Sequence, residues 1–313
     1  METYDAIVIG AGPAGCSAAL YAARASLSVL VLEHSVAGGQ IATTDAVDNY
    51  PGIPEVSGAE LGERLRDHAA ATGARFAYGS VSELVRDADG CFSIATDAGR
   101  YRARTVIAAL GATPRRAGFS GEDAFRGRGV SYCATCDAPF YRGKRVFVIG
   151  GGTTACEEAV YLARFAQTVE LVVRRDRFRA PRGVVERMLR VEKIKVRYLT
   201  SIVELTGERL PERIVFRDNG SGAMHEERFE AGSFGVFVLA GTDPATELLE
   251  PFVELGPDGG VITDESMATR TPGLFCAGDV RSKPVRQVVT AASDGAIAAS
   301  AAYRYVEEHF RSA

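Results

Sequence analysis

The stretch "AIVIGAGPAG", Ala6 to Gly15, decides the fold of this chain. An apolar, β-branched run ends at a glycine turn, and a helical stretch and a second apolar run follow, which is the pattern of a βαβ unit. Gly10, Gly12 and Gly15 stand where the turn is tight and where the backbone approaches a pyrophosphate, which then lies at the helix N-terminus. One copy of this fingerprint is weak evidence by itself.

The pattern recurs 140 residues later as "VFVIGGGTTACEEAVYLAR", which begins at Val146. Gly150 and Gly152 repeat Gly10 and Gly12, and each copy stands between a strand pattern and a helix pattern. Two such copies are strong evidence for two dinucleotide sites. The predicted fold is therefore α/β, with two Rossmann-like dinucleotide-binding domains.

The two copies differ where the ribose of a nucleotide should lie. Glu33 ends the second strand of the first copy, where a carboxylate accepts hydrogen bonds from a free ribose hydroxyl. The equivalent position of the second copy is Val173, followed by Arg174 and Arg175, with Arg179 behind them. Guanidinium groups bind a 2′-phosphate through charge-assisted hydrogen bonds, whereas a carboxylate repels it. The first site therefore suits FAD or NAD and the second NADP(H), the alternative for the arginines being a solvated basic strand end.

A later segment, "TPGLFCAGDV" from Thr271 to Val280, joins an apolar run to a Gly-Asp pair, and a long helical pattern starts near Val285. Asp279, at this strand-to-helix junction, can bond the sugar-alcohol chain of a flavin. A Gly-Asp pair alone usually marks only a turn. It gains weight here because a flavin site contributed by residues 1–110 needs a closing segment.

Two turn-rich junctions bound the second copy. They are "ALGATP" at 109–114 and "AGTDP" at 240–244, and each is a candidate hinge. The layout that follows is an NADP(H)-binding domain at 115–240, inserted into a discontinuous FAD-binding domain made of 1–114 and 241–313.

Composition argues against several other classes of protein. The chain has 313 residues, enough for two domains with cores of their own. Its net charge of −4 argues against a nucleic-acid or anionic-membrane partner. The segment Met1 to Asp5 is acidic where a signal peptide would be basic, and glycines interrupt the apolar stretch from Ala6, so neither a secretory signal nor a membrane span is predicted. Six scattered cysteines do not suit a disulfide-stapled secreted scaffold, and a cytoplasmic location is predicted.

Several stretches resemble one family along essentially the whole chain. They are "GAGPAG", "GGQIATTDAVDNYPG", "GRGVSYCATCDAPFYRGK", "RRDRFRA" and "GDVRSKPVRQVVTAASDGAIAA". The chain is similar to the low-molecular-weight, bacterial-type thioredoxin reductases, within the FAD/NAD(P)-linked pyridine nucleotide-disulfide oxidoreductases. The resemblance implies a homodimeric flavoenzyme that moves electrons from NADPH through FAD and a redox disulfide to thioredoxin.

The resemblance also implies site residues, position by position. Those that would bind FAD are Gly10, Gly12, Gly15, Glu33, Gly38, Gly39, Gln40, Asn49, Val81 (through its backbone), Asp279, Arg286 and Gln287. Those that would bind NADPH are Gly150, Gly152, Thr154, Arg174, Arg175 and Arg179. The chain departs from the family pattern at Thr153, Val173 and Leu110, of which the first two bear on nicotinamide affinity rather than on the reaction class.

Cys133 and Cys136, in "SYCATCDAPF", stand beside Asp137. Zinc requires four ligands, and no second C-x-x-C or paired histidine accompanies them, so no metal site is predicted. The polar neighbours Thr135 and Asp137 argue against an inert core pair. If a helix begins at the pair, its dipole favours the thiolate, which is the species that exchanges disulfides. The pair is interpreted as a redox centre in which, by resemblance, Cys136 is the flavin-side sulfur, Cys133 attacks the partner's disulfide and Asp137 carries the proton.

Other functions stay open on the sequence. A flavin-dependent disulfide reductase with another donor, such as reduced ferredoxin, or a dithiol oxidase typically lacks the arginines that this chain keeps. A non-enzymatic, flavin-binding redox sensor is a third alternative, and rapid turnover with a model disulfide would exclude it.

Overall fold

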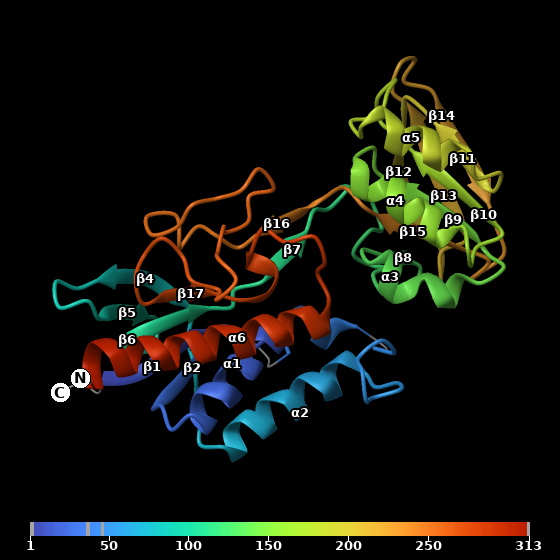
Figure 1. Cartoon of the computed structure of the whole chain (residues 1–313). Helices are drawn as coiled ribbons and strands as arrows, with labels where there is room; N and C mark the ends of the chain where they lie inside the picture. The colour runs from blue at the N-terminus through green and yellow to red at the C-terminus, as the bar shows by residue number, and fades with distance from the viewer. Residues whose placement is uncertain (1–2, 36–37, 45–46, 312–313) are drawn as a thin grey trace. The chain divides into compact units, whose positions relative to one another are not determined.

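The computed structural model describes residues 3–35, 38–44 and 47–311, and the chain divides into two compact units (Figure 1). The outer unit is discontinuous and comprises Met1–Thr113 and Asp243–Ala313. The inserted unit comprises Pro114–Thr242. Each unit is built on its own sheet with a parallel core, as the repeated glycine pattern predicts.

The sheet of the outer unit has the strand order β3-β2-β1-β6-β5-β4, and β17 also pairs with β6. The parallel strands are β1 (Thr3–Ile9), β2 (Val29–Glu33), β3 (Arg75–Tyr78), β6 (Gly99–Ala108) and β17 (Leu274–Cys276). The antiparallel strands β4 (Val81–Arg86) and β5 (Phe92–Thr96) extend it. Strands β1 and β2 are almost wholly buried, as expected for the centre of a parallel sheet covered on both faces.

Helices α1 (Pro13–Arg24), α2 (Gly58–Ala71) and α6 (Val288–Val306) accompany this sheet, with α1 and α6 side by side (Figure 1). Small residues permit their close approach: a Cβ at Gly295 would lie 2.1 Å from the backbone oxygen of Ala14. Helix α6 begins at Val288, later than the expected start near Val285, because Gln287 and Thr290 form a capping box there. Short turns η1 (Gly39–Thr43) and η3 (Gly278–Val280) and the terminal π-helical segment η4 (Glu307–Arg311) complete the helical elements described in this unit.

The inserted unit repeats this architecture on a smaller scale. Its parallel sheet has the order β11-β10-β9-β15-β8, made of β8 (Val130–Ser131), β9 (Arg145–Ile149), β10 (Thr168–Val172), β11 (Ile194–Arg197) and β15 (Phe234–Val238). A separate antiparallel sheet contains β12 (Thr200–Thr206), β13 (Arg213–Asp218) and β14 (Met224–Arg228). The helical elements are α3 (Ala134–Asp137), η2 (Ala138–Tyr141), α4 (Thr153–Leu162) and α5 (Arg182–Leu189).

The two junctions, expected as turns, contain short paired strands. Strands β7 (Ala112–Pro114) and β16 (Thr242–Pro244) form a two-stranded sheet. Gly111 and Gly241 have positive φ and precede these strands. Thr113 and Asp243 each stand before a proline, which disfavours helical backbone and makes an extended conformation the local preference. The residues typical of turns are therefore present, but short strands directly follow them.

No helix in the described part of the chain is both long enough and apolar enough to cross a membrane.

Candidate functional site

The glycine turn of the outer unit is closed by backbone contacts. Gly10 has φ +104°, and a Cβ there would lie 2.4 Å from the Ala109 oxygen. A Cβ at Gly15 would lie 1.8 Å from the Gly10 oxygen, so helix α1 approaches β1 as closely as backbone allows. Gly12 is the N-cap of α1, and no side chain of the described residues caps the helix there. The first-turn N–H groups are thus oriented for an anion such as a pyrophosphate.

Glu33 ties the end of β2 to this turn. Its side chain is buried; Oε2 accepts from the backbone N–H of Ala11 at 2.6 Å, and Oε1 accepts from those of His34 and Ser35 at 2.9 Å. Oε1 also accepts from Ser35 Oγ at 3.1 Å, so its acceptor positions are used. Oε2 has the Ala11 N–H as its one donor among the described residues, which leaves it a position for a ribose hydroxyl.

The next FAD candidates lie on the chain that follows Glu33. Gly38 and Gly39 both have positive φ at the start of η1, and the Gly38 N–H donates to the Ala11 oxygen at 2.9 Å. Gln40 is exposed, and Val81 begins β4 half-buried, opposite Thr96. The structure therefore brings Gly38 to the glycine turn and places Val81 at the start of the antiparallel extension.

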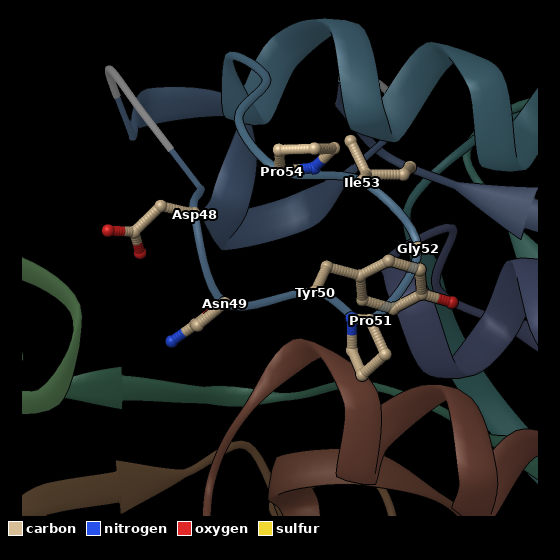
Figure 2. A pocket seen from close by; sticks show the side chains of 7 residues that line it. All are labelled: Asp48, Asn49, Tyr50, Pro51, Gly52, Ile53 and Pro54. Atoms are coloured by element: carbon tan, nitrogen blue, oxygen red, sulfur yellow. The ribbon is translucent and has the colours of Figure 1, made fainter.

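Asn49 and Gln287 are far apart in the sequence but bond directly. Asn49 Nδ2 donates to Gln287 Oε1 at 3.1 Å. Asn49 belongs to the loop Asp48–Pro54, which lines an open cavity of about 430 Å³ (Figure 2). This contact joins the loop before α2 to the N-cap of α6 and brings two FAD candidates, Asn49 and Gln287, into direct contact.

Asp279 and Arg286 carry buried polar atoms that have no partner among the described residues. These atoms are Asp279 Oδ1 and Arg286 Nε. Burial raises the pKa of the Asp279 carboxyl, although the charges of Lys283 and Arg286 oppose this. Buried polar groups are nearly always satisfied, so orphaned ones indicate a polar ligand. They fit the hydroxyl-rich chain of a flavin.

Asp279 lies between a strand and the long helix, as expected. It stands in the turn η3, which follows β17, and helix α6 begins at Val288. Gly278 has a φ of +77°, which suits a turn rather than a direct continuation into a helix.

The glycine turn of the inserted unit is more open at its third position, where Ala155 replaces the glycine. Gly152 is the N-cap of α4, again without a side-chain cap among the described residues, and a Cβ there would meet nothing within 4 Å. Gly150 is the crowded position, where a Cβ would lie 2.5 Å from the Ala155 Cβ. Thr153 and Thr154 are exposed on the first turn of α4. The open turn leaves room for a nucleotide backbone beside the helix N-terminus.

Arg174, Arg175 and Arg179 follow β10 and are all exposed. The Arg179 backbone N–H donates to the Gly151 oxygen at 2.7 Å, so this segment folds back onto the glycine turn. Val173 is buried with 3% exposure and fills the core beside Gly151 rather than facing a ligand. Only the arginines of this strand end are available to an anionic ligand.

Cys133 and Cys136 form a disulfide with a Cα–Cα distance of 5.3 Å. Cys133 is the N-cap of α3, its sulfur accepts from the Cys136 backbone N–H at 3.2 Å, and Thr135 Oγ1 lies 3.4 Å from it. The expected helix does begin at the pair, but α3 contains only Ala134–Asp137. One turn contributes little dipole, so direct N–H and O–H contacts to the Cys133 sulfur are the stronger influence on a thiolate.

Asp137 ends α3, half-buried. Burial, with the nearby Asp137 charge, raises the pKa of Tyr141 to about 12, so Tyr141 stays protonated beside this carboxylate. The structure thus groups Cys133, Cys136 and Asp137 on one short element of the inserted unit.

Sequence reasoning missed Glu158. This residue lies on α4, one position before the buried Ala159, and its Oε2 is buried without a partner among the described residues. The signal was available: Ala155, Glu158 and Leu162 are spaced three and four apart, so a carboxylate stands on the apolar stripe of the helix.

Comparisons with known proteins show the family to which the chain belongs. The profile described as pyridine nucleotide-disulphide oxidoreductase matches residues 4–295, and the chain belongs to this family. The chain is 44% identical to the thioredoxin reductase of Peptoclostridium litorale, over 99% of both chains. It is 42% identical to that of Bacillus subtilis strain 168, covering 98% of this chain and 96% of the relative. The crystal structure of thioredoxin reductase from Streptococcus pyogenes MGAS5005 matches with a TM-score of 0.91 at 38% identity, over 98% of this chain and 99% of that one.

These findings confirm the predicted α/β fold and the predicted family. Membership implies a flavin and a pyridine nucleotide as the redox groups.

Proposed function

We propose that this chain is a thioredoxin reductase that transfers electrons from NADPH, through FAD and the Cys133–Cys136 disulfide, to thioredoxin. The observation that carries the proposal is the disulfide on α3, in the same unit as an open glycine turn and exposed arginines. Likeness to thioredoxin reductases over nearly the whole chain supports it.

The outer unit would hold FAD. Its residues would be Gly10, Gly12, Gly15, Glu33, Gly38, Gly39, Gln40, Asn49, Val81, Asp279, Arg286 and Gln287. The closed turn and the carboxylate of Glu33 fit a pyrophosphate and a ribose with free hydroxyls, and the orphaned atoms of Asp279 and Arg286 fit further polar groups of the ligand. Bound FAD would supply the two-electron relay between nicotinamide and disulfide.

The inserted unit would hold NADPH. Gly150, Gly152 and Thr154 surround the open helix N-terminus, and Arg174, Arg175 and Arg179 would recognise the 2′-phosphate. Val173 supports the strand end from within the core. The preference for NADPH over NADH would thus depend on exposed cations rather than on a buried pocket.

The protein's own chemistry would take place on α3. Reduction breaks the Sγ–Sγ bond and adds two electrons and two protons, leaving two thiols. Cys133, as thiolate, would attack the thioredoxin disulfide and form a mixed disulfide, and the Cys136 sulfur would then displace the reduced thioredoxin. Asp137 would give and take the proton at Cys136 Sγ.

The proposal extends to assembly and location. The likeness to thioredoxin reductases supports a homodimer that works in the cytoplasm, and the acidic net charge of −4 argues against a nucleic-acid or anionic-membrane partner.

The test is to purify the protein, look for bound yellow flavin, and add NADPH, NADH or reduced ferredoxin anaerobically. Bleaching by NADPH, followed by turnover with thioredoxin, supports the proposal. A flavin bleached by reduced ferredoxin but not by saturating NADPH would replace it with the ferredoxin-dependent function, and failure to turn over any disulfide would favour a redox sensor.

A further inference from the structure

Asp294 is a buried carboxylate of α6, and sequence reasoning gave it no role. Its exposed fraction is 7%, and one of its oxygens, Oδ2, collects three donors from the segment that precedes the helix. These donors are the backbone N–H of Gly278 at 3.1 Å, Arg281 Nη1 at 2.9 Å and Lys283 Nζ at 2.8 Å. One carboxylate oxygen therefore holds the segment 278–283 against α6.

The two cations in this cluster are themselves largely buried. The side chains of Arg281 and Lys283 have exposed fractions of 13% and 8%. Arg281 Nε also donates to Thr263 Oγ1 at 2.8 Å, but Asp294 is the carboxylate that forms an ion pair with each cation among the described residues. Removing one member of a buried ion pair leaves an uncompensated charge, so both cations depend on Asp294 for their place.

The segment held by Asp294 carries Asp279, whose buried Oδ1 has no partner among the described residues. Gly278 brings this segment to the first turn of α1, because a Cβ at Gly278 would lie 2.8 Å from the Ala14 Cβ. Gly295, the neighbour of Asp294, meets the same turn, where its Cβ would lie 2.1 Å from the Ala14 oxygen. Asp294 thus fixes the Gly278–Asp279 turn beside the helix N-terminus that suits a pyrophosphate.

We propose that Asp294 is a positioning residue for FAD: it holds the Gly278–Asp279 turn where the Asp279 carboxyl can meet the cofactor. The inference rests on the proposed FAD site of the outer unit. It adds a residue that acts through Asp279 and two buried cations, without a contact of its own to the flavin.

The physical reason lies in the charge of Asp294. A carboxylate binds cationic donors through charge-assisted hydrogen bonds, whereas the oxygen of a neutral amide binds them about half as strongly. Asp294→Asn keeps an oxygen that can accept from the Gly278 N–H, but it removes the counter-charge of Arg281 and Lys283. The two cations would then move toward water and displace Asp279, although the side chain of Asp279 itself is unchanged.

The measurement is the dissociation constant for FAD. The flavin-loaded, full-length protein is diluted, and the flavin that passes an ultrafiltration membrane is quantified by fluorescence. This reading depends neither on NADPH nor on the disulfide nor on turnover. For Asp294→Asn we expect the dissociation constant to rise about 10-fold, the effect of weakening one charge-assisted hydrogen bond.

The Asp279→Ala background separates positioning from a general loss of stability. If Asp294 acts through Asp279, Asp294→Asn should raise the dissociation constant by less than about 3-fold in this background, because the effects of coupled residues are not additive. Two independent changes would add, so a merely structural role would give the same rise in both backgrounds.

Asp264→Asn is the matched control. Asp264 Oδ1 also collects three donors, which are the N–H groups of Ser266 and Ala268 at 2.9 Å and the Ser266 hydroxyl at 2.7 Å. Its side chain is exposed, and all three donors belong to its own turn. This variant should bind FAD within about 2-fold of the wild type, as expected for an exposed position away from the site.

A second variant keeps the test available if Asp294→Asn does not fold. Asp294→Asn combined with Lys283→Met removes one charge of each sign, so the net charge of the cluster is unchanged and only Arg281 remains to be paired. Its dissociation constant for FAD should also rise, and again by less in the Asp279→Ala background.

Equal rises in both backgrounds, or unchanged FAD binding in both Asp294 variants, overturn the inference while the proposed cofactor stands. A wild type that binds no FAD overturns the proposed cofactor and this inference with it. A flavin bleached by reduced ferredoxin but not by NADPH changes only the proposed donor, because the dissociation constants do not involve it.

Discussion

The two glycine turns share one backbone pattern but differ in how closely the following helix approaches the turn. In the outer unit a Cβ at Gly15 would lie 1.8 Å from a backbone oxygen, and Glu33 is bonded to the turn itself. In the inserted unit Ala155 occupies the position of Gly15, so α4 leaves room for a Cβ there, and exposed arginines follow β10. The surroundings of Gly150 and Gly152 are like those of Gly10 and Gly12. The first turn is therefore closed at its third position and braced by a carboxylate, and the second is open at that position and cationic.

This difference suits one site that retains its bound cofactor and a second site that exchanges its nucleotide. A closed turn with orphaned buried polar atoms nearby is typical of a site that a ligand completes, whereas an open turn with solvated cations permits fast exchange. The thiol chemistry distinguishes the units further, because the disulfide lies only in the inserted one among the described residues. The following predictions test this division.

The largest expected effect concerns the cysteines. Cys133→Ser and Cys136→Ser should each abolish thioredoxin reduction, because exchange requires both sulfurs, while reduction of the flavin by NADPH survives. The controls are Cys16→Ala and Cys156→Ala, at equivalent positions of α1 and α4. Burial raises their pKa to about 12 and about 11, so they carry little thiolate and should keep near-normal turnover.

The same variants test which sulfur faces the flavin. Cys133→Ser should give a long-wavelength charge-transfer band from Cys136. A band in Cys136→Ser instead would reverse the assignment of the two sulfurs.

A smaller effect is expected at the third position of each turn. Gly15→Ala should destabilise the outer unit by about 3 kcal/mol and release the flavin, since neither backbone can move away. The reciprocal change Ala155→Gly should cost only about 1 kcal/mol, the intrinsic helix penalty of glycine. Urea titrations followed by circular dichroism and flavin fluorescence compare the two. If Gly15→Ala retains flavin with an unchanged urea midpoint, the close contact at Gly15 does not limit the space between α1 and the turn.

Local patterns predicted much of this arrangement. The position of Glu33 at the end of β2 and the glycines before α1 and α4 follow from short-range rules of strand, turn and helix. What the sequence pattern could not supply was pairing across long separations. The strands β7 and β16 and the bond from Asn49 to Gln287 join segments that lie far apart in the chain.

Burial of individual side chains was the second feature that local sequence patterns could not predict. The sequence predicted a helix at the cysteine pair, but the restriction of α3 to a single turn and the burial of the Glu158 carboxyl on α4 depend on tertiary packing. A carboxylate on an apolar stripe signals such a site only once the helix face is known to be covered. The roles assigned to the individual site residues stay predictions.

The next prediction concerns the cations of the open turn. Arg174→Ala with Arg175→Ala should raise the KM for NADPH about 10- to 100-fold, since charge-assisted bonds are worth about 1.5–3 kcal/mol and exposure lowers this. NADH lacks the 2′-phosphate, so its kinetics should barely change. Arg177→Ala, an exposed arginine of the same segment, is the control. Equal losses with both nucleotides would mean that the pair supports the strand end rather than binding a phosphate.

The smallest effect on stability is expected at the first strand of each glycine-turn repeat. Asp5 of β1 and Arg145 of β9 occupy equivalent positions in the two copies. Burial alone would raise the pKa of Asp5, but hydrogen bonds from Ser28 and Arg104 and the charge of Arg311 outweigh it and hold the pKa below its usual value. A carboxyl group whose pKa is lower in the folded state stabilises the fold at pH values above its pKa in the unfolded chain. This stabilisation is lost as the pH falls through the pKa of the folded state.

Asp5→Asn should therefore lower the free energy of unfolding by about 1–2 kcal/mol at every pH from 8 to 5, and the difference from the wild type should shrink below pH 4. Arg145→Gln is the counterpart in the second copy. Arg145 is partly exposed and its nearest carboxylate, Glu227, lies 3.9 Å away, so its effect should be under about 1 kcal/mol and should not change over this range. Urea midpoints measured at four pH values separate the two patterns. A constant Asp5→Asn difference down to pH 3 would show that its hydrogen bonds, rather than its charge, hold the start of β1.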